Sequence, residues 1–345
     1  MIEVNRNGEV WVFAEQHNGL LEDTPIELMS KARHLADILK VKLAAVLPGD
    51  NVKNLAEKLI AHGADKVYVV ENPELKFYQT NSYTKVMYDL IHKHKPQIVL
   101  YGATAAGRDM APRIASAVKS GLTADCTDLQ IGDHTTVKDK KVHPNLLFQI
   151  RPAFGGNIIA TIINHDRWPQ MATVREGVMS PSEPDAKRKG EIVEEKIELT
   201  ALDLPLEIIE EHKRAKKVDL KAARIIVAGG AGVGSKDNFQ LIWDLANCLG
   251  AAPAATRAAV DLGFIDHDHQ VGQTGTTVRP SLYIAAGISG QIQHQAGMAQ
   301  SQKIIAINND PAAPIFNVAH YKIVGDLNVV IPMMIKAIRE KSIKE

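Results

Sequence analysis

Strand-length apolar runs alternate with helical patterns along most of this chain of 345 residues, and this alternation limits the folds open to it. The predicted strands of the first half are 10–14, 41–47, 67–70 and 98–101, and the predicted helices between them are 24–39, 51–62 and 81–94. Thr24, Pro25 and Glu27 offer a helix cap, a first-turn proline and a capping-box acid. A strand, a crossover helix and a second strand form the βαβ unit, so we predict a mostly parallel sheet covered on both faces.

The same alternation begins again at Arg224. Strands are predicted at 225–228, 251–255, 281–285, 304–307 and 321–324, with helices over 238–249 and from 328 onward. The sequence therefore predicts an α/β protein with two doubly wound, mostly parallel-sheet domains of the Rossmann-like kind.

The segment between the two alternating halves lacks the strand–helix alternation. Apolar stretches 145–151 and 157–164 flank Gly155-Gly156 without helical periodicity, so we expect paired strands that extend the first sheet. Residues 180–221 are rich in charge and proline and read as a linker with one short strand near 192–199. We place one domain at 1–205 and the other at 206–345.

Charge and cysteine content exclude several classes of function. Lys plus Arg equals Asp plus Glu at 40 each, so no bulk field would recruit nucleic acid. No apolar run approaches the roughly 18 residues of a spanning helix, so no membrane insertion is expected. The two cysteines, Cys126 and Cys248, form no CxxC pair, which argues against a disulfide framework or a zinc site and favours a cytoplasmic location.

Two glycine-rich turns follow predicted strands in the second half. Gly229–Gly230–Ala231–Gly232–Val233–Gly234 lacks the spacing of the dinucleotide fingerprint and of the Walker loop, and such turns often only let a helix pack closely. The second turn runs from Gly287 to His294 and is rich in Ser, Gln and His donors. Ser289 is a candidate cap there, and donors at a helix start suit a phosphate or an electron-rich ring edge. An ordinary capped helix is the alternative.

Longer motifs make the chain recognisable. They are VGQTG from Val271, the run from Pro280 to His294, AGM at Ala296, IIAINND at Ile304, GATAAGRDMAPRIASAVKSGLTADCTDL from Gly102, RPAFGGN from Arg151 and QMATVREGV from Gln170. Over nearly its whole length the chain resembles the electron transfer flavoprotein alpha-subunit family. The resemblance implies FAD in the second domain. It also implies that the first domain has lost nucleotide binding and packs on a beta subunit in a heterodimer. Arg108 and Asp109, which could look like a phosphate site, are then structural.

The resemblance also implies the residues of the FAD site. Arg257 is expected against the flavin ring, Gln273 and Thr274 at its N5 edge and His294 at its pyrimidine edge. The full set is Gly232, Thr256, Arg257, Val271, Gly272, Gln273, Thr274, Gly287, Ser289, Gly290, Gln291, Ile292, Gln293, His294, Asn308, Asp326 and Leu327. A guanidinium and an imidazole would stabilise the negative charge that a flavin gains on reduction.

Two positions depart from the commoner family pattern. Thr256 stands where many members have serine and keeps the hydroxyl, whereas Ala231 stands where many have arginine and loses a phosphate contact. We expect the backbone of Gly230 and Gly232 to bind phosphate in its place.

As a function, the resemblance implies relay of single electrons between a flavin-dependent dehydrogenase, such as an acyl-CoA dehydrogenase, and another redox partner, with the linker as a hinge. Anaerobic members oxidise NADH and bifurcate its electrons with a second FAD in the beta subunit, and Ala231 favours that type. A self-contained NAD-dependent dehydrogenase with His294 as its proton-transferring group is the alternative, and a nucleotide-sensing module without redox activity is a third reading. We assign no catalytic residue and no metal ligand, because Asp266, His267, Asp268 and His269 are consecutive and read as a solvated loop.

Overall fold

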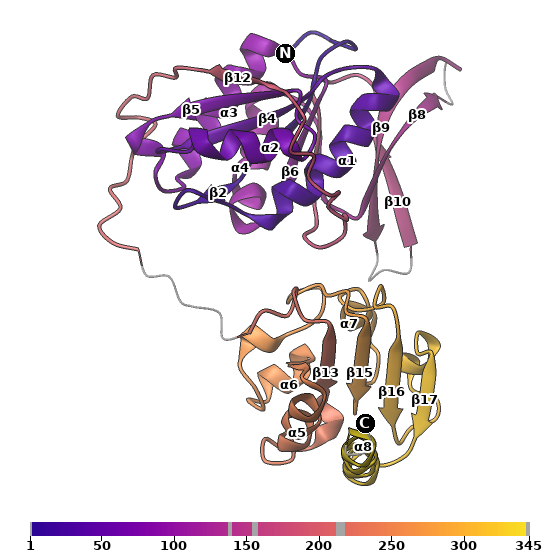
Figure 1. Ribbon diagram of the computed structural model, residues 1–345. Coiled ribbons are helices and arrows are strands. Elements are labelled where there is room, and N and C mark those ends of the chain that lie inside the picture. Colours follow the sequence, from indigo (N-terminus) through magenta and orange to yellow (C-terminus); the bar gives the residue numbers. More distant parts are fainter. Residues whose placement is uncertain (1, 137–139, 154–157, 212–217, 343–345) are drawn as a thin grey trace. The chain divides into compact units, whose positions relative to one another are not determined.

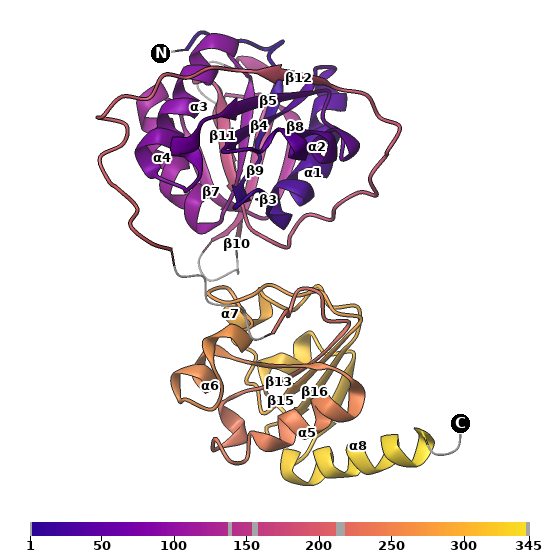
Figure 2. The same cartoon turned by 60° about the vertical axis from the view of Figure 1, so that its left-hand side comes forward.

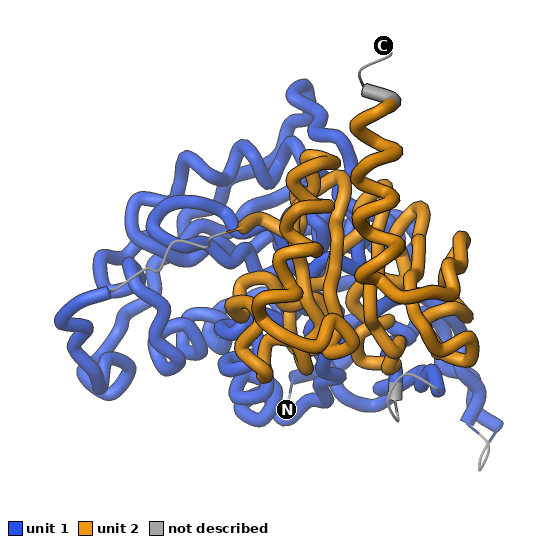
Figure 3. Tube along the Cα trace, turned by 90° about the horizontal axis from the view of Figure 1, so that it is seen from below, with its two compact units in different colours: residues 1–153, 158–211 blue, residues 154–157, 212–345 orange. Residues whose placement is uncertain are grey.

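The computed structural model describes residues 2–136, 140–153, 158–211 and 218–342. They form two compact units (Figure 3): an N-terminal unit of described residues up to 211 and a C-terminal unit of residues 218–342. The predicted glycine pair Gly155-Gly156 lies outside the described residues, as does part of the predicted linker.

The N-terminal unit is built on a seven-stranded sheet in the order β12-β5-β4-β1-β6-β11-β7, and all of its strand pairs are parallel. Its strands are β1 Val10–Phe13, β4 Leu43–Gly49, β5 Lys66–Glu71, β6 Ile98–Gly102, β7 Leu122–Cys126, β11 Gln170–Val174 and β12 Glu191–Glu194. Its helices are α1 Asp23–Leu39, α2 Ala56–Ala61, α3 Thr80–His94 and α4 Ala105–Val118. A short hairpin, β2 Gln16–His17 and β3 Leu20–Leu21, follows β1.

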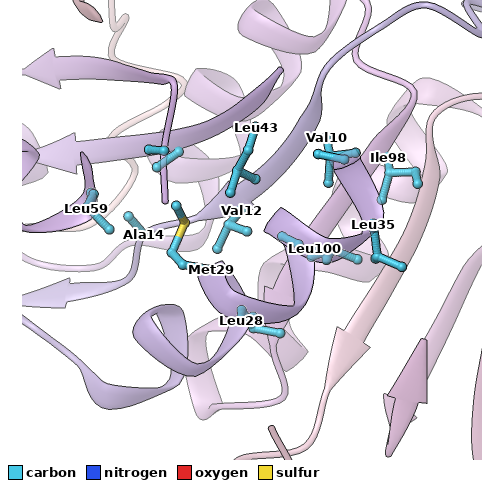
Figure 4. Close-up of a cluster of buried hydrophobic side chains, with 14 of the residues drawn as sticks. Val10, Val12, Ala14, Leu28, Met29, Leu35, Leu43, Leu59, Ile98 and Leu100 are labelled. Carbon is cyan, nitrogen blue, oxygen red and sulfur yellow. The ribbon is translucent and has the colours of Figure 1, made fainter. Parts of the chain in front are cut away.

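Helices cover both faces of this sheet, with α1 and α2 on one side and α3 and α4 on the other (Figure 2). Side chains of β1 alternate between the faces, as the strand period of two requires. Val10 and Val12 pack with Leu28 of α1 and Leu59 of α2 (Figure 4), whereas Trp11 packs with α3 and α4. The predicted α/β class with a doubly wound parallel sheet is confirmed.

The three strands that follow β7 in the chain do not extend this sheet, so that prediction is wrong. β8 Asp128–Thr135, β9 Val142–Ala153 and β10 Ile158–Ile163 form a separate antiparallel sheet in the order β10-β9-β8. The predicted pairing of the two apolar stretches is present as β9 and β10. The backbone of β9 is occupied by β8 on one side and β10 on the other, so it has no edge left for the parallel sheet.

Two further local predictions need correction. Thr24 is not the cap of α1, because the helix begins one residue earlier, at Asp23, after an N-cap Glu22 that makes no side-chain cap hydrogen bond. Glu27 instead accepts a hydrogen bond from the backbone N–H of Gly177, at 2.8 Å. The capping motif therefore supplies a buried threonine and a long-range contact in place of a capping box.

The C-terminal unit contains one parallel sheet of five strands in the order β14-β13-β15-β16-β17 (Figure 1). The strands are β13 Ile225–Gly229, β14 Ala252–Ala255, β15 Leu282–Ala286, β16 Ile304–Asn308 and β17 Tyr321–Val324. The helices are α5 Gln240–Leu249, α6 Arg257–Asp261, α7 Ile292–Gln295 and α8 Leu327–Ser342. Helices α5 and α8 pack on one face through Ile242, Leu245 and Ile331, and Phe316 and Leu220 cover the other.

Candidate functional site

A cavity of about 630 Å³ lies at the carboxyl edge of the C-terminal sheet. Numbered in chain order, the strands of that sheet run 2-1-3-4-5, so the direction of winding reverses between β13 and β15. Open α/β sheets bind ligands outside the strand ends at such a reversal. The volume also falls within the roughly 300–1,000 Å³ typical of cofactor and ligand pockets.

The floor of the cavity is formed by the glycine turns after β13 and β15, which pack directly on each other. Gly230 N–H donates to Ala286 O and Gly232 N–H donates to Gly287 O, both at 3.0 Å. A Cβ on Gly230 would lie 2.3 Å from Gly287 O, so no larger residue fits. The expectation that these two N–H groups bind phosphate is wrong, because the partner turn already occupies both.

Arg257 opens α6 at the rim of the cavity. Thr256 is the N-cap of this helix and accepts a hydrogen bond from Ala259 N–H at 3.4 Å. The Arg257 guanidinium lies 3.4 Å from a carboxylate oxygen of Asp261, and both side chains are largely exposed. Asp261 also lines the cavity, and sequence reasoning missed it although it stands four residues after Arg257.

The VGQTG loop brings Val271, Gly272, Gln273 and Thr274 to the cavity. Its shape depends on the buried residue before it, Gln270, whose Nε2 donates to Thr274 Oγ1 at 3.0 Å. Because that oxygen accepts from Gln270, its own O–H remains a donor to a partner elsewhere. Gln270 lines the cavity and was missed, although its position next to the motif could have revealed it.

The segment after β15 contributes Gly287, Ser289, Gln291 and Gln293. Ser289 is not the cap of the short helix α7, because Gln291 occupies the N-cap position and makes no side-chain cap hydrogen bond. The Ser289 carbonyl instead accepts from Ile315 N–H at 3.0 Å, which ties this segment to the loop after β16. The exposed Ser289 hydroxyl is therefore not used as a helix cap.

His294 lines the cavity but is 6% exposed, and both of its ring nitrogens have partners in the chain. Nδ1 lies 3.0 Å from Val271 O and Nε2 lies 3.1 Å from Tyr283 Oη. Burial lowers the pKa of His294 to about 4, although the hydrogen bond to Val271 opposes this shift. The ring is therefore neutral at physiological pH, so His294 brings no positive charge to the cavity.

Four predicted residues do not line the cavity: Gly290, Ile292, Asp326 and Leu327. Gly290 has a φ of +90°, and Leu327, the first residue of α8, is 6% exposed and belongs to the core. Asp326 accepts from the backbone N–H of Asn328 at the start of α8. Asn308 does line the cavity, and it donates to Ile288 O at 2.9 Å.

The structure adds lining residues that the predicted set lacks. They are Gly230, Ala231, Ala258, Asp261, Gln270, Ile288, Asp310, Ala313 and Pro314. Most come from neighbouring turns that a motif search passes over because their side chains are small or apolar. Ala231 is exposed and lines the cavity, so a methyl group faces it at this position.

The donor set fits FAD. Hydroxyls and amides of Thr256, Thr274, Ser289, Gln291 and Gln293 suit ribityl, ring-edge and phosphate oxygens, and Arg257 adds a fixed positive charge. These residues converge on one cavity from the segments that follow two strands, β14 and β15. The arrangement can bind an extended, partly anionic cofactor and stabilise negative charge on it.

The described residues offer no metal site and no membrane-spanning helix. Among the described residues no group of three or more His, Cys, Asp or Glu side chains is placed to hold a metal ion. The predicted solvated loop at Asp266–His269 is partly wrong, because His269 is 5% exposed and its Nδ1 lies 2.8 Å from Pro253 O. Within the described part of the chain no helix is long and apolar enough to cross a membrane.

Comparison with known proteins matches both units. The profile of the electron transfer flavoprotein domain covers residues 10–199, and that of the electron transfer flavoprotein FAD-binding domain covers residues 219–299. The alpha subunit of the electron transfer flavoprotein of Thermoanaerobacterium thermosaccharolyticum is 50% identical over 98% of this chain and 99% of its own length.

Two further relatives carry other names. The acryloyl-CoA reductase electron transfer subunit beta of Anaerotignum propionicum is 44% identical over 98% of this chain and 97% of its own length. The LctC subunit of the lactate dehydrogenase (NAD(+),ferredoxin) of Acetobacterium woodii is 41% identical over 95% of this chain and 76% of its own length. With both profiles matched and half of its residues shared with an alpha subunit, the chain belongs to the electron transfer flavoprotein alpha-subunit family and carries the FAD-binding domain of that family.

Proposed function

We propose that this chain holds FAD in the cavity at the β13–β15 reversal and relays single electrons between a flavin-dependent dehydrogenase and a second redox partner. The observation that carries the proposal is the convergence of the α6, VGQTG and post-β15 segments on one cavity with Arg257 at its rim. When bound, FAD supplies the one-electron chemistry. The chain's own residues bind it, orient it and place positive charge beside it.

The partners follow from the family. We propose a heterodimer with an electron transfer flavoprotein beta subunit and, as electron donor or acceptor, a dehydrogenase such as an acyl-CoA dehydrogenase. The cytoplasm stays the predicted location, from the cysteine pattern.

The first experiment is an anaerobic reductive titration of the chain co-expressed with its beta subunit, followed by visible absorption. Flavin absorbance that bleaches in two one-electron steps supports the proposal. A colourless complex that takes up no FAD contradicts it.

A pair of charge-removing variants tests the cavity itself. Arg257→Gln removes the cation at the rim, and Lys336→Gln removes an equally exposed cation of α8 that also has an acidic partner four residues on. We expect Arg257→Gln to weaken binding of reduced relative to oxidised FAD by about tenfold, the effect of roughly 1.4 kcal/mol. Lys336→Gln should change neither affinity, and equal effects of the two would place FAD elsewhere.

The self-contained NAD-dependent dehydrogenase loses support. It needs a proton-transferring group beside the nicotinamide, and His294 was the candidate. Because Val271 O and Tyr283 Oη occupy both ring nitrogens, no nitrogen of His294 is left to serve a substrate.

We further propose that the C-terminal unit moves on the linker. The linker's first part is fixed to the N-terminal unit, because β12 pairs with β5 and the buried Glu195 carboxylate accepts from Lys93 and His94. Leu206 and Ile209 beyond it are exposed and without regular structure. Shortening 204–209 should slow electron transfer between proteins and leave FAD affinity unchanged, whereas unchanged transfer would refute the hinge.

The bifurcating type remains our proposal for this member. It is supported by the relatives named for acryloyl-CoA reductase and for lactate dehydrogenase (NAD(+),ferredoxin), and by Ala231 at the cavity rim. A bifurcating complex holds a second FAD in the beta subunit, so the purified heterodimer should release two FAD. One FAD with one AMP would indicate an ordinary carrier.

A further inference from the structure

A buried chain of hydrogen bonds leads from the core of the C-terminal sheet to the cavity. It starts at Tyr283, the second residue of β15, whose side chain is 0% exposed. The Tyr283 hydroxyl lies 3.1 Å from His294 Nε2, and His294 Nδ1 lies 3.0 Å from Val271 O. Of the three groups, Val271 and His294 line the cavity, whereas Tyr283 stands behind them.

The partners determine where the protons lie. A backbone carbonyl only accepts, so His294 Nδ1 must carry a hydrogen and donate it to Val271 O. In a neutral imidazole Nε2 then has a lone pair, and the Tyr283 O–H is the donor that satisfies it. A buried hydroxyl without an acceptor is destabilising, so this direction also satisfies Tyr283.

No charged side chain in the described structure is a hydrogen-bond partner of this ring. The charged groups that line the same cavity are Arg257 and Asp261 of α6 and Asp310 after β16, and the titratable group behind the ring is Tyr283. Burial raises the pKa of Tyr283, so its hydroxyl stays protonated. Arg257 is thus the permanent cation among the described lining residues.

We infer that Tyr283 is a positioning residue that holds His294 in its neutral, Nδ1-protonated form, so that among the described lining residues Arg257 supplies the positive charge. The inference rests on the proposed function, since its consequence concerns FAD. It narrows the expectation that imidazole and guanidinium both stabilise reduced flavin, because only the guanidinium carries a charge.

The proton positions are tested first on the wild-type full chain without FAD, by nitrogen-15 NMR of histidine-labelled protein. His294→Gln assigns the signal among the chain's 13 histidines. We expect a His294 ring protonated at Nδ1 only, from pH 8 down to pH 5.5. A ring protonated at Nε2, or at both nitrogens at pH 6, would overturn the inference whether or not FAD binds.

The consequence for the cofactor is tested with Tyr283→Phe in the FAD-loaded heterodimer. Loss of the donor to Nε2 removes a hydrogen bond that favours the neutral ring, so His294 should take up a proton at higher pH. The measured quantity is the affinity for reduced FAD divided by that for oxidised FAD, compared with the same ratio in wild type. Between pH 8 and pH 5.5 it should rise about tenfold, which corresponds to a nearby charge worth roughly 1.4 kcal/mol.

Tyr101→Phe is the matched control. Tyr101 is also 0% exposed and its hydroxyl has no hydrogen-bond partner among the described residues, but it lies in β6 of the N-terminal unit. It should follow wild type at both pH values. If Tyr283→Phe also follows wild type at both, while its NMR spectrum shows a protonated His294, the link to FAD is refuted. If Tyr283→Phe does not fold, an Nδ1-only wild-type ring still supports the inference, and any other form overturns it.

Discussion

The carboxyl edges of the two parallel sheets differ, although the sheets have similar architectures. In the N-terminal unit the winding reverses between β1 and β6, and the Glu15 carboxylate fills that point, accepting from Thr104 Oγ1 at 2.6 Å. In the C-terminal unit the reversal between β13 and β15 is lined by Gly230, Gly232 and Gly287 and opens into the cavity. The difference lies in the turn residues: the half-buried carboxylate of Glu15 repels anions, whereas bare backbone leaves room for one.

The N-terminal edge is closed by more than Glu15. Asp109 of α4 accepts from Tyr78 Oη at 2.7 Å and from Thr80, and Arg108 Nε donates to Ala103 O at 2.6 Å. The two residues that might have marked a phosphate site are therefore engaged within the unit. This arrangement gives a physical reason for the absence of nucleotide binding that the family resemblance implies there.

The largest effect is expected from adding a side chain to a closely packed glycine of the C-terminal unit. A Cβ on Gly290 would lie 2.1 Å from Ile315 N, and φ there is +90°. We expect Gly290→Ala to destabilise the C-terminal unit by about 3–5 kcal/mol, because strain and overlap add. Urea unfolding followed by Trp243 fluorescence would measure it.

Gly234→Ala is the control for that variant. Gly234 has the same φ of +90°, but a Cβ there would meet nothing within 4 Å. It should cost about 1–2 kcal/mol from backbone strain alone. Equal costs for the two variants would show that close packing of the turns is unimportant.

Acid should weaken the C-terminal unit through His294. Its pKa is about 4 in the folded chain and 6.5 as a free side chain, so the unfolded state binds the extra proton between those values. Stability is complete above pH 6.5 and falls as pH drops, by about 3 kcal/mol at pH 4. The difference in unfolding free energy between wild type and His294→Gln, followed from pH 7 to pH 4, should show this dependence; a constant difference would contradict a buried neutral ring.

The N-terminal edge should respond to pH in the opposite sense. Burial raises the pKa of Glu15 above 4.5, and Glu22 and Glu176 add to the shift, although Thr104 opposes it. The stability associated with this group is present below pH 4.5 and lost as pH rises through the folded pKa. Glu15→Gln should therefore stabilise the N-terminal unit at pH 7 by about 0.5–1 kcal/mol and have no effect near pH 3. Thermal unfolding at both pH values decides, and a loss at pH 7 would contradict the sign.

The smallest effect is expected at the exposed carboxylate of the C-terminal edge. Asp261 pairs with Arg257 in solvent, so Asp261→Asn should change stability by less than about 0.5 kcal/mol. It should raise the affinity for reduced relative to oxidised FAD, because it removes a negative charge from the cavity. A redox titration against wild type measures this, and a fall in that affinity ratio would show that Asp261 is needed to orient Arg257.

The strand and helix order, the two parallel sheets and the position of the cavity-lining loops followed from periodicity and motifs, because those signals are local in the sequence. β17 Tyr321–Val324 has the predicted bounds, and the VGQTG and Gly287–His294 segments both reach the cavity. Asp261 and Gln270 carried weak local signals beside Arg257 and VGQTG. Gly290, Ile292, Asp326 and Leu327 were included by motif position, but they are not among the residues that line the cavity.

Only the tertiary structure decided the states of the site residues. Gly230 and Gly232 donate their N–H groups to Ala286 and Gly287, in a turn more than 50 residues away. These N–H groups are therefore not available to a phosphate. The protonation state of His294 likewise depends on a distant residue, because the Tyr283 hydroxyl of β15 is its hydrogen-bond partner. The sequence by itself determined which residue types reach the cavity, because local spacing sets strand ends and turns. Burial and hydrogen-bond partners come from segments distant in the chain, so protonation and free donors emerged only with the fold.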